Sequence, residues 1–251
     1  MSISVCLAAY NGARFIREQV DSILPQLRPD DEIVVVDDCS RDNTVEILER
    51  YADPRMTIHR NQRNGGHVYS FGRALSLATR DVVFMADQDD RWADGRVAAM
   101  LETLNEAKVL LVSGNTSYMD AEGRPIEYSA TRLRKADSRR HFMNVVGMFT
   151  GRTGYYGCAM AMRRELLDLV LPIPAFVESH DLWISMGANL LRSNAHLEGD
   201  TLARRVHGEN ASILRRDLYM RLRARWIFCR SIAVLMARAR RIRNLHPIGH
   251  R

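Results

Sequence analysis

The sequence of 251 residues is poor in cysteine, and its cysteines do not have the spacing of zinc sites or disulfide frameworks. No CxxC pair occurs, and the four cysteines lie far apart, at Cys6, Cys39, Cys158 and Cys229. The sequence therefore predicts neither a disulfide-stapled nor a zinc-stabilised domain. We expect a reduced protein of the cytoplasm.

Long apolar segments are also missing. The apolar run at residues 3–9 has no basic residues before it and is shorter than a secretory signal requires, so we interpret it as a strand. The most apolar part of the C-terminal region, residues 226–237, falls short of the ~20 apolar residues that a membrane-spanning helix needs. A membrane-spanning protein is not predicted.

Acidic residues almost disappear after residue 212. Residues 213–251 contain eleven arginines and one acid and carry a net charge of +10, which leaves −4 for the rest of a chain whose total is +6. Apolar residues recur there at steps of three and four and predict a basic amphipathic helix: Leu218, Leu222, Trp226, Cys229, Ala233 and Met236. Such a helix either lies on an anionic membrane surface or packs on the domain with its basic face in solvent. Nucleic acid is not a predicted partner, because no recognition motif accompanies the arginines.

Strand and helix signals alternate along the first part of the chain. Amphipathic helical patterns separate apolar strands, which we expect at residues 3–9, 32–38, 56–60 and 81–86, with helices at 14–27, 40–48 and 70–78. This alternation predicts an α/β fold, Rossmann-like, with a mostly parallel central sheet flanked by helices. Ligands of such sheets gather at the carboxyl ends of the strands.

Three polar clusters stand at those strand ends, at residues 10–12, 37–38 and 87–89. Carboxylates repel one another and lose solvation when clustered, so such groups either hold a cation or stay in water. Oxygen ligands of this kind suit Mg²⁺ or Mn²⁺. Taken alone, a single DxD pattern favours a solvated turn, since aspartate forms local hydrogen bonds in turns.

Seven segments occur in an order and spacing that resemble a known family: SVCLAAYNGARFIREQVDSIL, EIVVVDDCSRDNTVEIL, NQRNGG, DVVFMADQDDRW, GYYGCAMAMRREL, SHDLWIS and RRVHGENAS. Together they resemble family-2 glycosyltransferases with the GT-A fold, and most closely the bacterial rhamnosyltransferase-type enzymes of O-antigen and capsule assembly. The resemblance covers residues 2–212. It implies a nucleotide-sugar-binding half at residues 1–115 and an acceptor-binding, catalytic half of the same domain at 116–212, followed by the basic helical tail at 213–251.

The resemblance also implies an activity. The protein would be an inverting, metal-dependent glycosyltransferase that transfers a sugar from a nucleotide-diphosphate donor to a lipid-linked glycan. The resemblance favours dTDP-L-rhamnose as this donor. Donors of the UDP-hexose type are the alternative. This reaction would take place at the inner face of the cytoplasmic membrane, with the protein held there peripherally.

The resemblance assigns residues to the donor nucleotide. Tyr10 would cover the base, and Asp38 would accept a hydrogen bond from the uracil or thymine N3–H, which suits a carboxylate because it only accepts. Ala8 stands where family members often have threonine, so the side-chain part of that contact is absent. Asn64 and Gly65 would lie near the base and ribose.

Further residues would bind the ribose, the metal and the diphosphate. Asp87 would contact the ribose, Asp89 and His207 would bind Mg²⁺ or Mn²⁺, and Arg204 and Arg205 would meet the diphosphate. Three nearby residues have further roles: Asp37 is a strand-end turn or a direct contact, Asp90 supports the loop, meets the acceptor or is a solvated carboxylate, and Asn210 would steady the loop.

For catalysis, the resemblance assigns Asp181 as the general base that deprotonates the acceptor hydroxyl. A bare N-cap role at the start of a helix is the alternative. His180 stands before it, where the family often has glutamate. The small residues Gly157, Cys158 and Ala159 would line the donor-sugar pocket or simply allow close packing.

Two other classes of protein remain to be compared. A nucleotidyltransferase usually carries a glycine-rich, basic loop after its first strand, and the YNGARF segment is poor in glycine. An inert binding module would be free to lose Asp89 or Asp181, and both are present. Both observations favour a glycosyltransferase.

Overall fold

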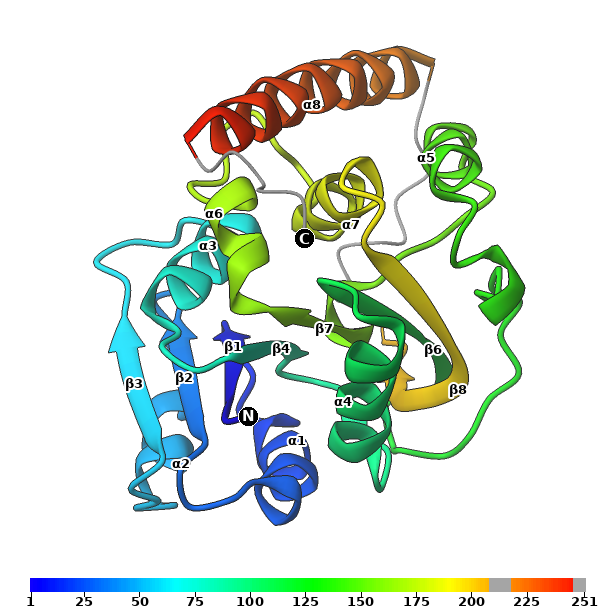
Figure 1. Cartoon of the computed structure of the whole chain (residues 1–251). Coiled ribbons are helices and arrows are strands. Elements are labelled where there is room, and N and C mark those ends of the chain that lie inside the picture. The colour runs from blue at the N-terminus through cyan, green and yellow to red at the C-terminus, as the bar shows by residue number, and fades with distance from the viewer. Residues whose placement is uncertain (208–217, 246–251) are drawn as a thin grey trace.

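The computed structural model describes residues 1–207 and 218–245, and its eight strands form one sheet (Figure 1). Their order across the sheet is β3-β2-β1-β4-β7-β6-β8-β5. The pairs β1–β2, β1–β4, β2–β3 and β6–β8 are parallel, whereas β7 and β5 run antiparallel to their neighbours. The strands are β1 (Ile3–Ala9), β2 (Glu32–Asp37), β3 (Met56–Arg60), β4 (Val82–Asp87), β5 (Arg91–Trp92), β6 (Leu111–Met119), β7 (Met160–Arg163) and β8 (Asn194–Arg205). The prediction of an α/β fold with a mostly parallel sheet is confirmed.

Helices cover both faces of this sheet. They are α1 (Ile16–Ile23), α2 (Thr44–Glu49), α3 (His67–Leu77), α4 (Arg96–Ala107), α5 (His141–Thr150), α6 (Leu167–Val170), α7 (His180–Leu190) and α8 (Leu218–Leu245). One core joins the sheet to α1, α2 and α4, and the other joins it to α3, α5, α6, α7 and α8. Within β1, Val5 and Leu7 enter the first core and Cys6 the second, as the side-chain period of a strand requires. Coverage of both faces explains why the strands read as continuous apolar runs.

Several predicted boundaries shift for identifiable reasons. The helix expected at 14–27 ends at Ile23 and continues as a short 3₁₀ turn that contains Pro25. Ser40 does not cap a helix, because its hydroxyl accepts a hydrogen bond from the Asn11 N–H and α2 begins only at Thr44. The predicted boundary between residues 115 and 116 falls inside β6, so the two halves share one continuous sheet.

The C-terminal helix α8 lies across the top of the molecule, over α6 and α7 (Figure 1). Its buried residues are Phe228, Ser231, Leu235 and Ala239, and Arg238 donates hydrogen bonds to the carbonyl oxygens of Leu169 and Pro172 at 3.1 and 2.8 Å. The packing interpretation of this helix therefore applies to one of its faces. No helix among the described residues is long and apolar enough to cross a membrane.

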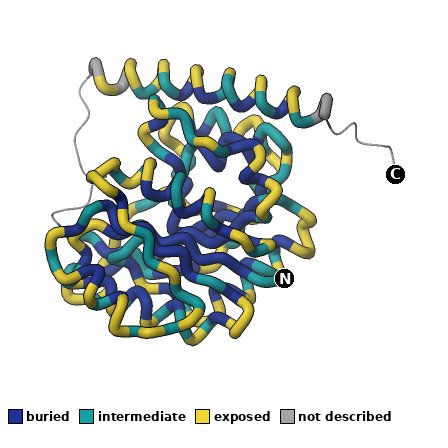
Figure 2. The backbone as a smooth tube through the Cα atoms, turned by 90° about the vertical axis from the view of Figure 1, so that its left-hand side faces the viewer, coloured by how far each residue is buried: buried dark blue, intermediate teal, exposed yellow. Residues whose placement is uncertain are grey.

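The predicted apolar stripe of α8 is not the face that packs on the domain. Leu222, Trp226 and Met236 are 57, 60 and 41% exposed, and Cys229 and Ala233 are exposed as well. Figure 2 shows exposed residues on the outer side of α8 and buried residues on the side that faces the domain. The helix thus carries two apolar faces, and only tertiary contacts decide which one is buried.

Candidate active site

The carboxyl ends of β1, β2 and β4 meet at one edge of the sheet. In register, Ala8 of β1 lies between Val36 of β2 and Asp87 of β4. The loops that follow therefore start side by side, although residues 8 and 87 are far apart in the chain. The three polar clusters expected at this edge are brought together.

Gln88 holds two of these loops together, a role that the sequence analysis did not assign. Its side-chain amide donates to the Tyr10 carbonyl at 3.0 Å and accepts from the Tyr10 N–H at 2.6 Å. A Cβ on Gly12 would lie 2.4 Å from Gln88 Oε1, so only glycine leaves room for this clamp. The position of the Tyr10 backbone thus depends on the middle residue of the DQD segment.

Gln19 is a second residue that the sequence analysis missed. It is fully buried in α1 and donates from Nε2 to the carbonyl oxygen of Asp87 at 2.6 Å. The available signal was a polar side chain between Ile16, Val20 and Ile23 on the buried face of the helix. A buried amide needs a partner, and here the partner is the strand end that carries the aspartates.

Asp38 is buried and organises the loop that follows β3. Its carboxylate accepts hydrogen bonds from Asn61 Nδ2 at 2.7 Å and from the Gly65 and Gly66 N–H groups at 2.8 and 2.7 Å. A carboxylate has about four acceptor positions, so three of them are used within the protein. Asp38 therefore fixes the backbone of the loop at Gly65 and Gly66.

The other residues assigned to the nucleotide lie around this loop. Tyr10 is 42% exposed, Asn64 and Gly65 are exposed, and Ala8 is partly buried in the sheet. Asp37 is fully buried and accepts from the Ser40 N–H and from Arg60 Nε at 3.1 and 3.2 Å. Of the two roles considered for Asp37, these contacts support the structural one, in which it stabilises the turn that follows β2.

Asp87, Asp90 and Cys158 form an acidic centre: their potential ligand atoms lie within 4.8 Å of one another. Burial, together with the charges of Asp89 and Asp181, raises the pKa of Asp87 to about 6. Burial and the charges of Asp87 and Asp89 raise the pKa of Asp90. Asp90 is only 2% exposed, so the solvated-carboxylate interpretation of this residue is wrong.

The composition of this centre fits a divalent cation. Within the part of the chain that the structure describes, Asp90 Oδ2 is buried without a hydrogen-bond partner. A cation would relieve both this orphaned oxygen and the repulsion that raises the carboxyl pKa values. Carboxylate oxygens with an imidazole nitrogen nearby suit Mg²⁺ or Mn²⁺, whereas the thiol of Cys158 is a poor ligand for them.

The two predicted metal ligands lie next to each other. His207 Nε2 is 2.8 Å from Asp89 Oδ2, and both side chains are largely buried. The ring of His207 also packs on Phe15, with ring centroids 5.0 Å apart. The structure therefore unites Asp89 and His207, which are 118 residues apart in the chain.

The two predicted diphosphate ligands differ in their placement. Arg204 is partly exposed, and its guanidinium lies 4.5 Å from the centroid of the Tyr156 ring. Burial alone would lower the pKa of this guanidinium, but Cys158, Asp87 and Asp90 raise it. Arg205 is buried, and its guanidinium donates to carbonyl oxygens of Asp89, Asp120 and Ala121 and to the Glu18 carboxylate. We therefore correct the assignment of Arg205 to the diphosphate. Its role is structural, because its guanidinium is hydrogen-bonded inside the fold.

Asp181 lies in the first turn of α7, but it does not cap the helix. The cap is Ser179, whose hydroxyl accepts from the Leu182 N–H at 3.2 Å. Asp181 Oδ1 instead lies 2.8 Å from His180 Nε2, an ion-pair distance without hydrogen-bond alignment, and 27% of the Asp181 side chain is exposed. The N-cap interpretation of Asp181 is wrong, and its carboxylate faces the site.

His180 sets the electrostatics of Asp181. Burial alone would raise the pKa of Asp181, but the charge of His180, the nearby Gly157 N–H and the charge of Arg204 lower it. Burial alone would lower the pKa of His180, but the charge of Asp181 raises it. The His180 ring stacks on Phe71, with ring centroids 4.3 Å apart. Asp181 is thus kept in the ionised form that a base requires.

Gly157 leaves room for this pair. A Cβ at this position would lie 2.6 Å from Asp181 Oδ1 and 2.8 Å from His180 Nε2. The close approach expected in the segment 157–159 therefore comes from the protein's own side chains. Residue 158 follows directly with its thiol in the acidic centre, so this short segment connects Asp181 to Asp87 and Asp90.

A Gly157→Ala substitution is expected to lower kcat by roughly 10- to 100-fold, because a displacement of ~1 Å in a reacting group has an effect of this order. Steady-state kinetics beside thermal unfolding would measure it. Gly199→Ala is the matched control, since nothing lies within 4 Å of a Cβ there. Unchanged kcat in Gly157→Ala would show that the position of the Asp181 carboxylate does not limit the reaction.

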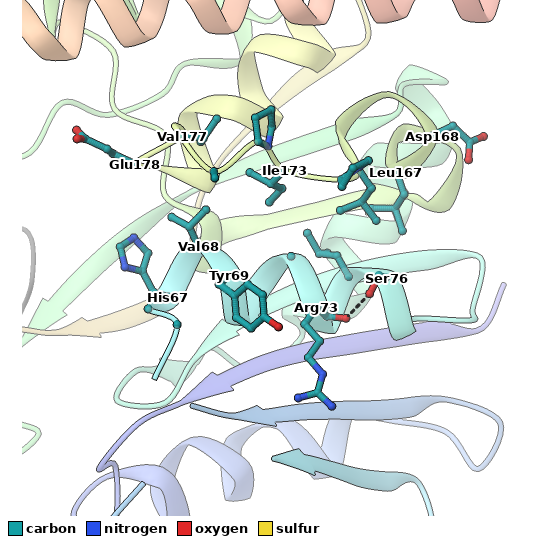
Figure 3. A pocket seen from close by; sticks show the side chains of 18 of the residues that line it. His67, Val68, Tyr69, Arg73, Ser76, Leu167, Asp168, Ile173, Val177 and Glu178 are labelled. Carbon is teal, nitrogen blue, oxygen red and sulfur yellow. Dashed lines mark hydrogen bonds between the residues drawn. The ribbon is translucent and has the colours of Figure 1, made fainter. Parts of the chain in front are cut away.

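A large cleft with a volume of about 1260 Å³ opens on the side of the sheet covered by α3. It runs along α3 opposite residues 164–178, and Figure 3 shows Val68, Ile173 and Val177 pointing into it. Asp87, Asp89 and Asp181 lie outside its lining, but at one end His67 lies with its ring centroid 5.7 Å from that of His180. The cleft therefore leads toward the His180–Asp181 pair and not over the acidic centre.

Comparison with protein families places this geometry in context. The sequence model described as Glycosyl transferase family 2 matches residues 4–171, which include β1 through α6 and the acidic centre. His180, Asp181, Arg204 and His207 lie after the matched segment.

Curated relatives match parts of the chain. The chain is 29% identical over 180 residues to an "Uncharacterized glycosyltransferase" of Nostoc sp., covering 69% of this chain and 54% of that protein. It is 32% identical over 127 residues to the "Putative teichuronic acid biosynthesis glycosyltransferase TuaG" of Bacillus subtilis, covering 50% of each. It is 28% identical over 113 residues to the "UDP-Glc:alpha-D-GlcNAc-diphosphoundecaprenol beta-1,3-glucosyltransferase WfaP" of Escherichia coli, covering 45% of each. The chain spans about half the length of these relatives.

A solved structure shows the same fold. The crystal structure of TarS from S. aureus in complex with UDP-GlcNAc superposes with a TM-score of 0.68 at 21% identity, covering 95% of this chain and 72% of that one. The expected GT-A fold is thereby confirmed. At this identity the likeness concerns the fold alone.

Proposed function

The chain belongs to glycosyl transferase family 2, and from this membership we propose that it transfers a sugar from a nucleotide-diphosphate donor to a lipid-linked glycan in cell-surface polysaccharide synthesis. One observation carries the proposal: Asp181 lies against Gly157, whose neighbour Cys158 belongs to the acidic centre with Asp87 and Asp90. The names of TuaG and WfaP support the substrate class.

The proposed reaction is a single displacement with inversion. Asp181 accepts the proton of the acceptor hydroxyl as that oxygen bonds to the anomeric carbon, and the bond from this carbon to the diphosphate oxygen breaks. The bonding electrons leave with the nucleoside diphosphate, and Arg204 offsets the developing negative charge. A base of this kind contributes about 10²- to 10⁴-fold to the rate.

We further propose that Asp89 and His207 hold a divalent cation, Mg²⁺ or Mn²⁺, with Asp87 on the ribose and Asp90 in support. When bound, the cation would supply Lewis-acid stabilisation of the leaving diphosphate. We propose that the nucleotide base binds at the strand ends, in contact with four residues and close to Ala8 of β1: Tyr10, Asp38, Asn64 and Gly65.

The identity of the donor sugar is the most specific part of the proposal. The sequence resemblance to rhamnosyltransferase-type enzymes favours dTDP-L-rhamnose. In contrast, WfaP is named for UDP-Glc, and the TarS structure is a complex with UDP-GlcNAc. A UDP-hexose is therefore the alternative donor. The lipid-linked acceptor places the reaction at the inner face of the cytoplasmic membrane, and we propose that the protein associates there peripherally through α8.

Calorimetric titration tests the proposal. The purified protein would be titrated with dTDP-L-rhamnose, UDP-glucose, UDP-galactose and UDP-GlcNAc, each with Mg²⁺, with Mn²⁺ and with EDTA. We expect one donor to bind only when a metal is present, and that donor identifies the sugar. Metal-independent binding would contradict the role of Asp89 and His207, and absence of binding by every nucleotide sugar would contradict the proposed function.

A further inference from the structure

Large apolar side chains are exposed on two neighbouring helices. On α5, Phe142 and Met143 are 77 and 52% exposed, and on α8 Leu222 and Trp226 are 57 and 60% exposed. We call these four residues, together with Phe149, the α5–α8 surface. Single exposed apolar residues are ordinary, but a group of this size marks an interaction site.

Contacts between the helices make this surface continuous. The rings of Phe149 on α5 and Phe228 on α8 lie with centroids 5.4 Å apart, and the Arg225 guanidinium lies 5.5 Å from the Phe149 ring. Phe142 precedes Phe149 by seven residues, so both lie on one face of α5. Phe149 therefore contacts α8 at Phe228 on its buried face and at the exposed Arg225, which precedes Trp226 in the chain.

Positive charge dominates helix α8, although Arg223 pairs with Glu178 at 2.8 Å. Residues 218–245 contain eight arginines and neither an acidic residue nor a lysine. Arg223, Arg225, Arg230, Arg240 and Arg241 are exposed. Guanidinium groups bind phosphate with two parallel hydrogen bonds and pair readily with apolar surroundings, so this combination complements a phosphate-bearing, apolar partner.

We propose that the α5–α8 surface binds the surface of an anionic phospholipid membrane. Phe142, Met143, Leu222 and Trp226 enter the boundary between headgroups and acyl chains, and the arginines contact lipid phosphates. This goes beyond the predicted basic tail, because α5 contributes half of the apolar side chains. The inference rests on the proposed function only in that a lipid-linked acceptor is found at such a surface.

Co-sedimentation of the full chain with vesicles tests the proposal. Vesicles of phosphatidylglycerol and phosphatidylcholine would be compared with vesicles of phosphatidylcholine alone, at low and high salt. We expect binding to the anionic vesicles that weakens at high salt. Deleting residues 213–251 is unsuitable as a test, because it would also remove the buried side chains of Phe228 and Leu235 from the core.

Two pairs of substitutions separate the contributions of the helices: Phe142→Ser with Met143→Ser, and Leu222→Ser with Trp226→Ser. Each pair should lower the partition coefficient by about tenfold or more, from the apolar area that no longer inserts. Tyr128→Ser is the matched control, because Tyr128 is 53% exposed and lies in neither helix. It should bind vesicles like the unmodified protein.

Four results would overturn the proposal: no binding to anionic vesicles, equal binding to neutral ones, an α5 pair that binds normally, or substitutions that instead abolish a dimer measured by light scattering. The last result would make the surface a contact between copies of the chain. Donor titration of the same variants should be unchanged, so failure of vesicle binding is distinguishable from failure of the proposed transferase activity.

Discussion

Asp181→Asn is expected to lower kcat by about 10²- to 10⁴-fold while donor affinity stays nearly unchanged. The amide keeps the size of the side chain but cannot accept the hydroxyl proton. Turnover of the donor identified by titration would measure kcat, and calorimetry would measure donor binding. A comparable loss of donor binding would show that Asp181 holds the donor instead of serving as the base.

The pH profile of kcat in a His180→Gln variant provides a second check on the role of Asp181. Because the charge of His180 lowers the pKa of Asp181, His180→Gln should raise that pKa. The base is active in its ionised form, above its pKa, so the acidic limb of the kcat profile should move to higher pH. An unmoved acidic limb would contradict the coupling between His180 and Asp181.

Asp89→Asn is expected to weaken metal-dependent donor binding by about 10- to 100-fold, the range for losing one charged contact. The change removes one negative charge from a proposed cation ligand that contacts His207. Calorimetric titration with and without EDTA would separate the metal-dependent part of the affinity from the remainder.

Asp94→Asn is the matched control for this substitution. It makes the same charge change a few residues later, at an exposed position. If Asp89→Asn weakens donor binding equally in EDTA, or if Asp94→Asn has the same effect, the assignment of the cation to Asp89 is wrong. Asp181→Asn and Asp89→Asn together test the division between proton transfer and donor binding.

Patterns that repeat along the chain determined most of the fold. Strand β1 coincides with the predicted run at residues 3–9 and β3 with that at 56–60, because apolar runs and turn residues are local signals. The meeting of the three polar loops followed from the parallel sheet, whose strand ends share one edge. The resemblance then pointed to Asp181 and to the pair Asp89 and His207.

The roles of single polar residues depended on the tertiary structure. Arg204 and Arg205 are adjacent in the chain, yet only Arg205 is buried with its guanidinium committed to the fold. Gln19 and Gln88 show no local pattern that marks their bonds to Asp87 and Tyr10, because these bonds join segments more than 60 residues apart. The sequence shows which polar groups need hydrogen-bond partners, but the partners themselves depend on how the chain packs.

Helix α8 and Gly157 show the same limit. The periodicity of α8 revealed an apolar stripe, but contacts with α6 and α7 bury the stripe of Phe228 and Leu235 and leave that of Leu222 and Trp226 outside. Gly157 indicated a close approach, and only the structure identified Asp181 and His180 as the groups that approach. The sequence by itself determined the strands, the helices and the edge where the site forms. The tertiary structure decided burial and side-chain pairing, because both depend on distances between segments that are remote in the chain.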